Sequence, residues 1–207
     1  YFLLSCIIRA KKNRNKISRC SAILIIRGFS MVLRLIKKTS SETFHWQIWK
    51  ENKQLHILSG TLGVPGKEET MPLGFFESSK GTIKKLAKEK INQGYEYVKE
   101  DSYTKVVVQY PCEDASQFEM ANERTLFVED ILDDVLHLTG NGKLYGSEVG
   151  DEGGTTFVLV LDVELALNTI LEELTKHQVI DDAEIAYEKG EGEYVGLYPE
   201  GLKFELI

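Results

Sequence analysis

Three lysines in the sequence are spaced for binding phosphate. Lys80, Lys84 and Lys88 follow one another at intervals of four residues, and residues at that spacing share one face of an α-helix. A row of ammonium groups can neutralise successive phosphates of a nucleic acid. The alternative interpretation is a solvated outer face, because surface helices carry their charges there. We therefore treat these lysines as candidate nucleic-acid-binding residues.

A glycine-rich stretch, LHILSGTLGVPG at residues 55–66, precedes the lysines. This stretch either closes a hairpin or forms a loop that binds another group. Gly60 and Gly63 can adopt positive φ, so turn geometry is the simplest reason for their presence. The sequence alone leaves the second use open.

A second glycine motif, TGNGKLYG at residues 139–146, has some of the spacing of a dinucleotide-binding loop. That loop must follow a strand and open a helix, whereas this motif follows a predicted helix and precedes a predicted strand. Acidic residues close behind it would also repel phosphate. We therefore predict no nucleotide cofactor at this motif.

Residues for metal or nucleophilic chemistry are scattered. The three cysteines and four histidines include no pair at zinc-ligand spacing, and GSEVG places its serine one position early for a nucleophile elbow. We predict no metal, no cofactor and no enzymatic activity from a recognised motif. A pair of carboxylates that only the fold brings together remains the alternative.

The first half of the sequence predicts a hairpin followed by a helix. Residues 43–50 alternate in polarity like a strand, except that Trp49 is out of step, and residues 54–60 form the returning strand. Residues 60–74 are predicted to be a Gly/Pro-rich connection. A helix then begins at Ser78 or Ser79 and ends at Gly94.

The second half predicts an α-β-α-β-β order. The expected elements are a helix at 124–138, a glycine loop, a buried strand at 155–163, a helix at 163–177 and a hairpin near 183–200. The run KVVVQY at residues 105–110 would close the first sheet, and residues 111–121 would be a polar linker. The fold class is therefore predicted to be α+β.

The first half also resembles a known family. Its matching segments are FHWQIW at 44–49, GTLG at 60–63, the helix entry at 76–79 and KEKINQGYEYV at 88–98. Together they resemble the WGR domain of poly(ADP-ribose) polymerases and of bacterial regulators of the molybdate-metabolism type. The C-terminal half is similar to uncharacterised bacterial domains. The polymerase catalytic domain would not fit in the remaining length, so ADP-ribosyl transfer is not implied.

The resemblance fails at the triplet that names the family. In the polymerases its tryptophan stacks against a DNA end and its arginine contacts the backbone. Here the triplet falls on Ser59, Gly60 and Thr61, which keep the glycine and lack both the ring and the charge. The resemblance thus implies the fold more strongly than the DNA contact. Trp46 and Trp49 are the candidates to replace the missing stacking ring if they are exposed.

Charge divides the chain into parts. Residues 1–30 carry a net charge of +7, residues 31–110 carry +4 and residues 111–207 carry −18. We predict an N-terminal extension at 1–30, a WGR-like domain at 31–110 and an acidic α+β domain at 122–207. The extension is interpreted either as translation upstream of Met31 or as a basic amphipathic segment that touches a membrane surface.

Two functions from different classes follow. The first is a bacterial, cytoplasmic, non-enzymatic regulator that binds DNA or RNA weakly through Lys80, Lys84 and Lys88, with Trp46, Trp49, Gly60 and Thr61 beside them. The second is a protein–protein adaptor whose acidic module binds a basic partner. No run reaches the roughly 18 apolar residues that a membrane-spanning helix needs, so we expect no membrane partner.

Overall fold

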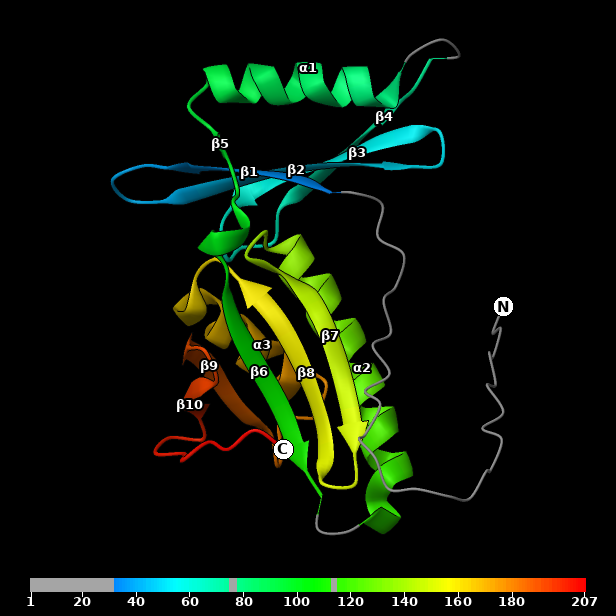
Figure 1. The fold of residues 1–207 in the computed structure, drawn as a ribbon. Helices are drawn as coiled ribbons and strands as arrows, with labels where there is room; N and C mark the ends of the chain where they lie inside the picture. The colour runs from blue at the N-terminus through cyan, green and yellow to red at the C-terminus, as the bar shows by residue number, and fades with distance from the viewer. Residues whose placement is uncertain (1–31, 75–77, 113–114) are drawn as a thin grey trace.

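The structure, a computed structural model, describes residues 32–74, 78–112 and 115–207. Two antiparallel sheets lie one above the other, with one helix on a face of the first and two helices on a face of the second (Figure 1). This confirms the predicted α+β class. The predicted N-terminal extension and part of the predicted helix entry at 76–79 lie outside the described residues.

The first sheet has the strand order β4-β3-β2-β1-β5 and is covered on one face by helix α1 (Figure 1). Its elements are β1 (Leu33–Lys38), β2 (Thr43–Glu51), β3 (Gln54–Thr61), β4 (Lys67–Pro72), α1 (Ser79–Asn92) and β5 (Glu96–Tyr97). The predicted hairpin is β2–β3, which is confirmed.

Strand β4 lies inside the segment predicted to be a loop, so that prediction was wrong. The strand is an exposed edge with the sequence KEETMP. An edge strand with both faces largely in water needs no hydrophobic alternation. Its pairing with β3 is therefore not visible in the sequence pattern.

Helix α1 forms as predicted. The Ser78 hydroxyl accepts a hydrogen bond from the Gly81 amide at 3.4 Å, which satisfies one free N–H of the first turn. Ala87 is fully buried against the sheet. Gly94 follows the helix with φ of +90°, a conformation that glycine adopts without a Cβ penalty.

The second sheet has the strand order β10-β9-β6-β8-β7. Its elements are β6 (Thr104–Pro111), α2 (Phe118–Leu138), β7 (Gly142–Gly150), β8 (Gly153–Val160), α3 (Val163–Lys176), β9 (Glu184–Gly190) and β10 (Glu193–Tyr198), with short 3-10 turns at Glu100–Ser102 and Ala115–Gln117. The chain order β-α-β-β-α-β with the sheet order β9-β6-β8-β7 is that of a ferredoxin-like unit, and β10 extends its edge.

Three predictions for the second half were wrong. Strand β6 does not close the first sheet but lies between β8 and β9 at the centre of the second. The predicted glycine loop is largely the β7–β8 hairpin. Helix α2 begins at Phe118, within the predicted linker. The second sheet therefore begins at Thr104, inside the expected 31–110 domain. A run of valines predicts a buried strand without saying which sheet will bury it.

Strand β2 is covered on both faces, by different partners. Trp46 and Ile48 point to the core beneath α1. On the alternate face His45 and Gln47 point to the second sheet and its helices α2 and α3, which we call the second module, the first sheet and α1 being the first. Both side chains are 1% exposed, as period-2 alternation requires. Trp49 lies on this second face, which explains why it was out of step with an amphipathic strand.

The two modules meet where the β3–β4 loop contacts the end of α2. The Gly63 amide donates to the Thr139 carbonyl at 3.0 Å, and the Gly66 amide donates to the Leu138 carbonyl at 2.9 Å. The last carbonyls of a helix lack partners within the helix. The loop therefore caps α2 from outside. We call this contact the seam.

A third hydrogen bond joins the seam from β2. The Gln47 amide nitrogen donates to the His137 carbonyl at 2.9 Å, and the Gln47 oxygen accepts from Arg34 Nε at 2.8 Å. The Arg34 guanidinium thus lies near the C-terminal end of α2, where a positive charge is favourable. This hydrogen bond satisfies one polar group of each module, the Gln47 side-chain amide of the first and the His137 carbonyl of the second.

We expect Gly140→Ala to destabilise the fold more than Gly192→Ala. Both glycines have positive φ, +68° and +76°, which costs a non-glycine residue about 1–2 kcal/mol. A Cβ at Gly140 would lie 2.2 Å from His45 Cγ across the seam, whereas Gly192 has no atom within 4 Å. Overlap should add on the order of 2 kcal/mol at Gly140 alone.

Urea unfolding of both variants and the parent chain measures this difference. Equal losses at the two positions would show that the seam accepts a side chain at residue 140, contrary to the close approach of His45.

Candidate functional site

The predicted lysine row is presented to solvent. Lys80, Lys84 and Lys88 are all exposed on α1, which lies at the end of the molecule remote from the second sheet (Figure 1). Lys85 is exposed as well, and Glu89 is the only acidic residue of the helix. The structure thus brings the three candidate lysines together on a basic surface, which we call the α1 basic face.

Lys90 belongs to the same helix but has a different role. Its ammonium lies 6.0 Å from the centre of the Trp46 ring and 5.4 Å from that of Tyr95. Cation–π contacts of this kind hold the lysine over the aromatic faces. Lys90 therefore packs the end of α1 onto the sheet instead of joining the α1 basic face.

Neither tryptophan is available to stack on a base. Trp46 is 2% exposed in the core beneath α1. Trp49 is half-buried at the seam, stacked on His56 with ring centres 5.3 Å apart and edge-on to His137 at 4.8 Å. The expectation that either ring replaces the missing stacking residue is corrected, because both rings are occupied inside the molecule.

Gly60 and Thr61 both take part in the local packing of the β3–β4 loop. A Cβ at Gly60 would lie 3.0 Å from Gly66 Cα and 3.2 Å from His45 Nε2. The Thr61 carbonyl accepts from the Val64 amide at 3.1 Å, which closes the tight turn of the β3–β4 loop. The glycine-rich stretch therefore binds the C-terminal end of α2 through backbone hydrogen bonds.

His45 is the buried polar residue that the sequence reasoning missed. It is 1% exposed, and neither ring nitrogen has a hydrogen-bond partner among the described residues. Burial, followed by the nearby His137 and Arg34, lowers the pKa of His45 from 6.5 to about 4. The imidazole is therefore neutral at pH 7. The signal available in the sequence was its alternation with Trp46 and Ile48, which face α1.

His137 shares this environment at the other side of the seam. Burial and the Arg34 charge lower its pKa, while Glu68 and Asp134 act in the opposite direction. A proton on either imidazole would be placed beside Arg34 in a desolvated contact. Burial and the Arg34 charge therefore favour the neutral form of both histidines at the seam.

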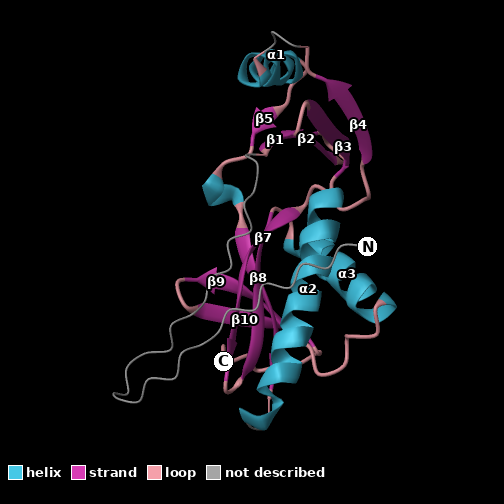
Figure 2. Ribbon diagram, turned by 90° about the vertical axis from the view of Figure 1, so that its right-hand side faces the viewer, coloured by secondary structure: helices cyan, strands magenta, loops and turns pink. Residues whose placement is uncertain are grey.

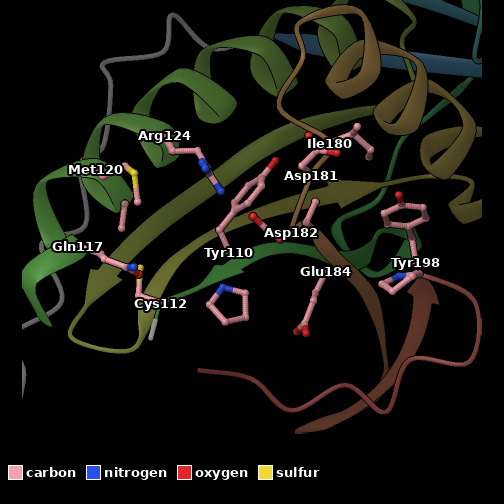
Figure 3. Close-up of a pocket in the computed structure, with 14 residues that line it drawn as sticks. Tyr110, Cys112, Gln117, Met120, Arg124, Ile180, Asp181, Asp182, Glu184 and Tyr198 are labelled. Atoms are coloured by element: carbon pink, nitrogen blue, oxygen red, sulfur yellow. The ribbon is translucent and has the colours of Figure 1, made fainter. Parts of the chain in front are cut away.

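A groove of about 690 Å³ opens in the second module, between the start of α2 and the chain leading into β9 (Figure 3). Arg124 from α2 and Tyr110 from β6 form one side, and Asp181, Asp182 and Glu184 contribute carboxylates. Figure 3 shows the Arg124 guanidinium beside the Tyr110 ring, at 5.0 Å from its centre. The groove could accommodate a small polar molecule.

Two polar groups of this groove are held by hydrogen bonds to neighbouring elements. The Tyr110 hydroxyl donates to the Val179 carbonyl at 2.7 Å, and burial raises the pKa of this phenol well above its usual range. Glu184 accepts from Gln109 at 2.8 Å. The described lining residues include no histidine.

No family model, curated protein or solved structure matches this chain. The resemblance to the WGR domain thus stays a prediction. Within residues 32–74, 78–112 and 115–207, no helix is long and apolar enough to cross a membrane. In those same ranges no three His, Cys, Asp or Glu side chains are grouped to hold a metal ion.

We expect acidification to weaken the fold partly through His45. Below pH 6.5 the unfolded chain protonates this histidine while the folded chain does not, so stability falls until the pH reaches about 4, the pKa of His45 in the fold. The shift corresponds to a loss of about 3 kcal/mol. His45→Leu, a non-titrating side chain of similar size, should lose correspondingly less stability between pH 7.5 and pH 4.5.

The measurement is chemical unfolding of parent and variant at both pH values. The matched control is His177→Leu, the same replacement at a histidine outside the seam whose side chain is 37% exposed. An identical pH dependence for the parent and His45→Leu would contradict the role given to His45.

Proposed function

We propose that this chain is a non-enzymatic regulator of the bacterial cytoplasm whose WGR-like first module binds nucleic acid weakly through the α1 basic face. The observation that supports the proposal is the exposure of Lys80, Lys84 and Lys88 in one row. The scattered cysteines are consistent with a reducing compartment. No ring or guanidinium from the triplet position assists the lysines.

The expected binding is electrostatic and independent of base sequence. Phosphate contacts fix a protein on nucleic acid without reading its sequence. If three lysines each neutralise one phosphate, log K against log salt should have a slope of about −3 on duplex DNA. The acidic second module repels nucleic acid, which favours an approach from the end of the molecule that carries α1.

Charge reversal on α1 tests the proposal. Lys84→Glu/Lys88→Glu in the full chain should lower affinity for nicked and single-stranded DNA at least tenfold at low salt, because it replaces attraction by repulsion. Fluorescence anisotropy across a salt series gives both the affinity and the slope. The matched control is Lys189→Glu/Lys203→Glu, which makes the same change of charge at exposed positions in the second module.

The control double variant should bind nearly as well as the parent. Absence of salt-sensitive binding at micromolar protein concentration, or equal losses in the two double variants, would refute the use of the α1 basic face.

A protein–protein adaptor is the second candidate function. It is favoured by the large apolar side chains that α2 exposes within a module of net charge −18 over residues 111–207. Exposed apolar groups in an acidic surface suit a basic partner protein. In a pull-down from lysate, partners of this kind should persist after nuclease treatment, whereas partners held through nucleic acid should be lost.

A further inference from the structure

Helix α2 carries an apolar stripe that the fold does not cover. Met120, Phe127 and Leu138 are 52%, 45% and 40% exposed. Their spacing of seven and eleven residues places them on one side of the helix. From Met120 to Leu138 the stripe is about 27 Å long at the rise of an α-helix.

The stripe borders a groove between α2 and α3, which lie side by side in Figure 2. The groove has a volume of about 370 Å³, and Phe127, Ile131, Val135 and Leu138 form its apolar wall. On the α3 side the His177 ring meets the Phe127 ring edge-on at 5.7 Å. The groove is thus large enough for one or two apolar side chains of a partner.

Carboxylates surround this apolar surface. Asp130, Asp134 and Glu173 line the groove, and Lys176 is its one basic lining residue among those described. The Lys176 ammonium is held by Glu173 at 2.9 Å. Helix α2 as a whole has six acidic residues and one basic residue. The charge at the groove therefore selects a positively charged occupant.

We propose that the α2–α3 groove binds a basic amphipathic helix of another protein. Its apolar face would lie along the α2 stripe, and its lysines or arginines would face Asp130 and Asp134. A helix in a hydrophobic groove is a recurring mode of recognition, in which a few apolar anchors supply the affinity. The proposal rests on the adaptor function, to which it adds a site and a class of partner.

The probe is a fluorescein-labelled synthetic peptide of 18 residues, with leucine at the a and d positions of each heptad and lysine elsewhere. A peptide of identical composition with scrambled order is its partner probe. The full chain should bind the periodic peptide with a Kd in the micromolar range and the scrambled peptide at least tenfold more weakly. The periodic peptide should also gain helical circular dichroism on binding.

Two phenylalanines of α2 provide a matched pair of variants. Phe127 lies in the groove, whereas Phe118 is nine residues away, on about the opposite side of the helix, and is similarly exposed at 39%. Phe127→Ala should weaken binding of the periodic peptide at least tenfold. Phe118→Ala should change it less than twofold. Unfolding curves of both variants confirm that each is folded.

Charge is tested in the same assay. Asp134→Lys should weaken binding of the periodic peptide at least fivefold, while Asp151→Lys, the same change at an exposed turn of the second module, should change it less than twofold. Equal losses in these two variants, or equal affinity for the periodic and scrambled peptides, would show general attraction to an acidic surface and overturn the proposal.

Two further results would also overturn it. If Phe127→Ala binds the periodic peptide like the parent while nuclease-resistant partners are still captured, the adaptor function survives and this groove is not its site. If light scattering shows a dimer that Phe127→Ala converts to a monomer, the occupant is a second copy of the chain.

Discussion

The capping of α2 by the first module is the interaction on which the rest of the structure depends. Three carbonyls at the end of this helix, those of His137, Leu138 and Thr139, accept hydrogen bonds from Gln47, Gly66 and Gly63. Each bond contributes only about 1 kcal/mol net, but a carbonyl buried without a partner costs more than that. Since the donors and acceptors belong to different modules, the two sheets cannot separate without exposing both sets to water.

The seam also accounts for the packing of several candidate residues. Trp49 and Gly60 lie on the face of the first sheet that the second module covers. His45 is buried there between glycines, with no partner for either ring nitrogen. A buried polar group left in this state costs about 1–3 kcal/mol, which the surrounding contacts must offset. Because the second module covers one face of the first sheet, α1 on the opposite face is the helix that the first module presents to solvent (Figure 1).

Helices α1 and α2 carry opposite charges. Helix α1 has five basic residues and one acidic residue, whereas α2 has six acidic residues and one basic residue. Helix α1 lies at the end of the molecule remote from the second sheet (Figure 1), and charges farther apart than the Debye length, about 8 Å at physiological salt, are largely screened from one another. Each helix can therefore present its own potential to a partner, which makes a nucleic-acid contact through α1 and a basic-protein contact through α2 physically compatible.

Local patterns in the sequence determined the β2–β3 hairpin, α1 with its Ser78 cap and Gly94 stop, α3 and the last hairpin, because alternation, helical periodicity and caps are properties of neighbouring residues. The lysine row was visible for the same reason. Only the tertiary structure decided that KVVVQY, in β6, joins the second sheet and that KEETMP, β4, pairs as an edge strand. It also decided that the Trp46 and Trp49 rings pack against other side chains of the molecule. Those outcomes depend on which surfaces meet across the fold. The alternation of β2 shows which residues share a face, but not that α1 covers one face while the end of α2 meets the other.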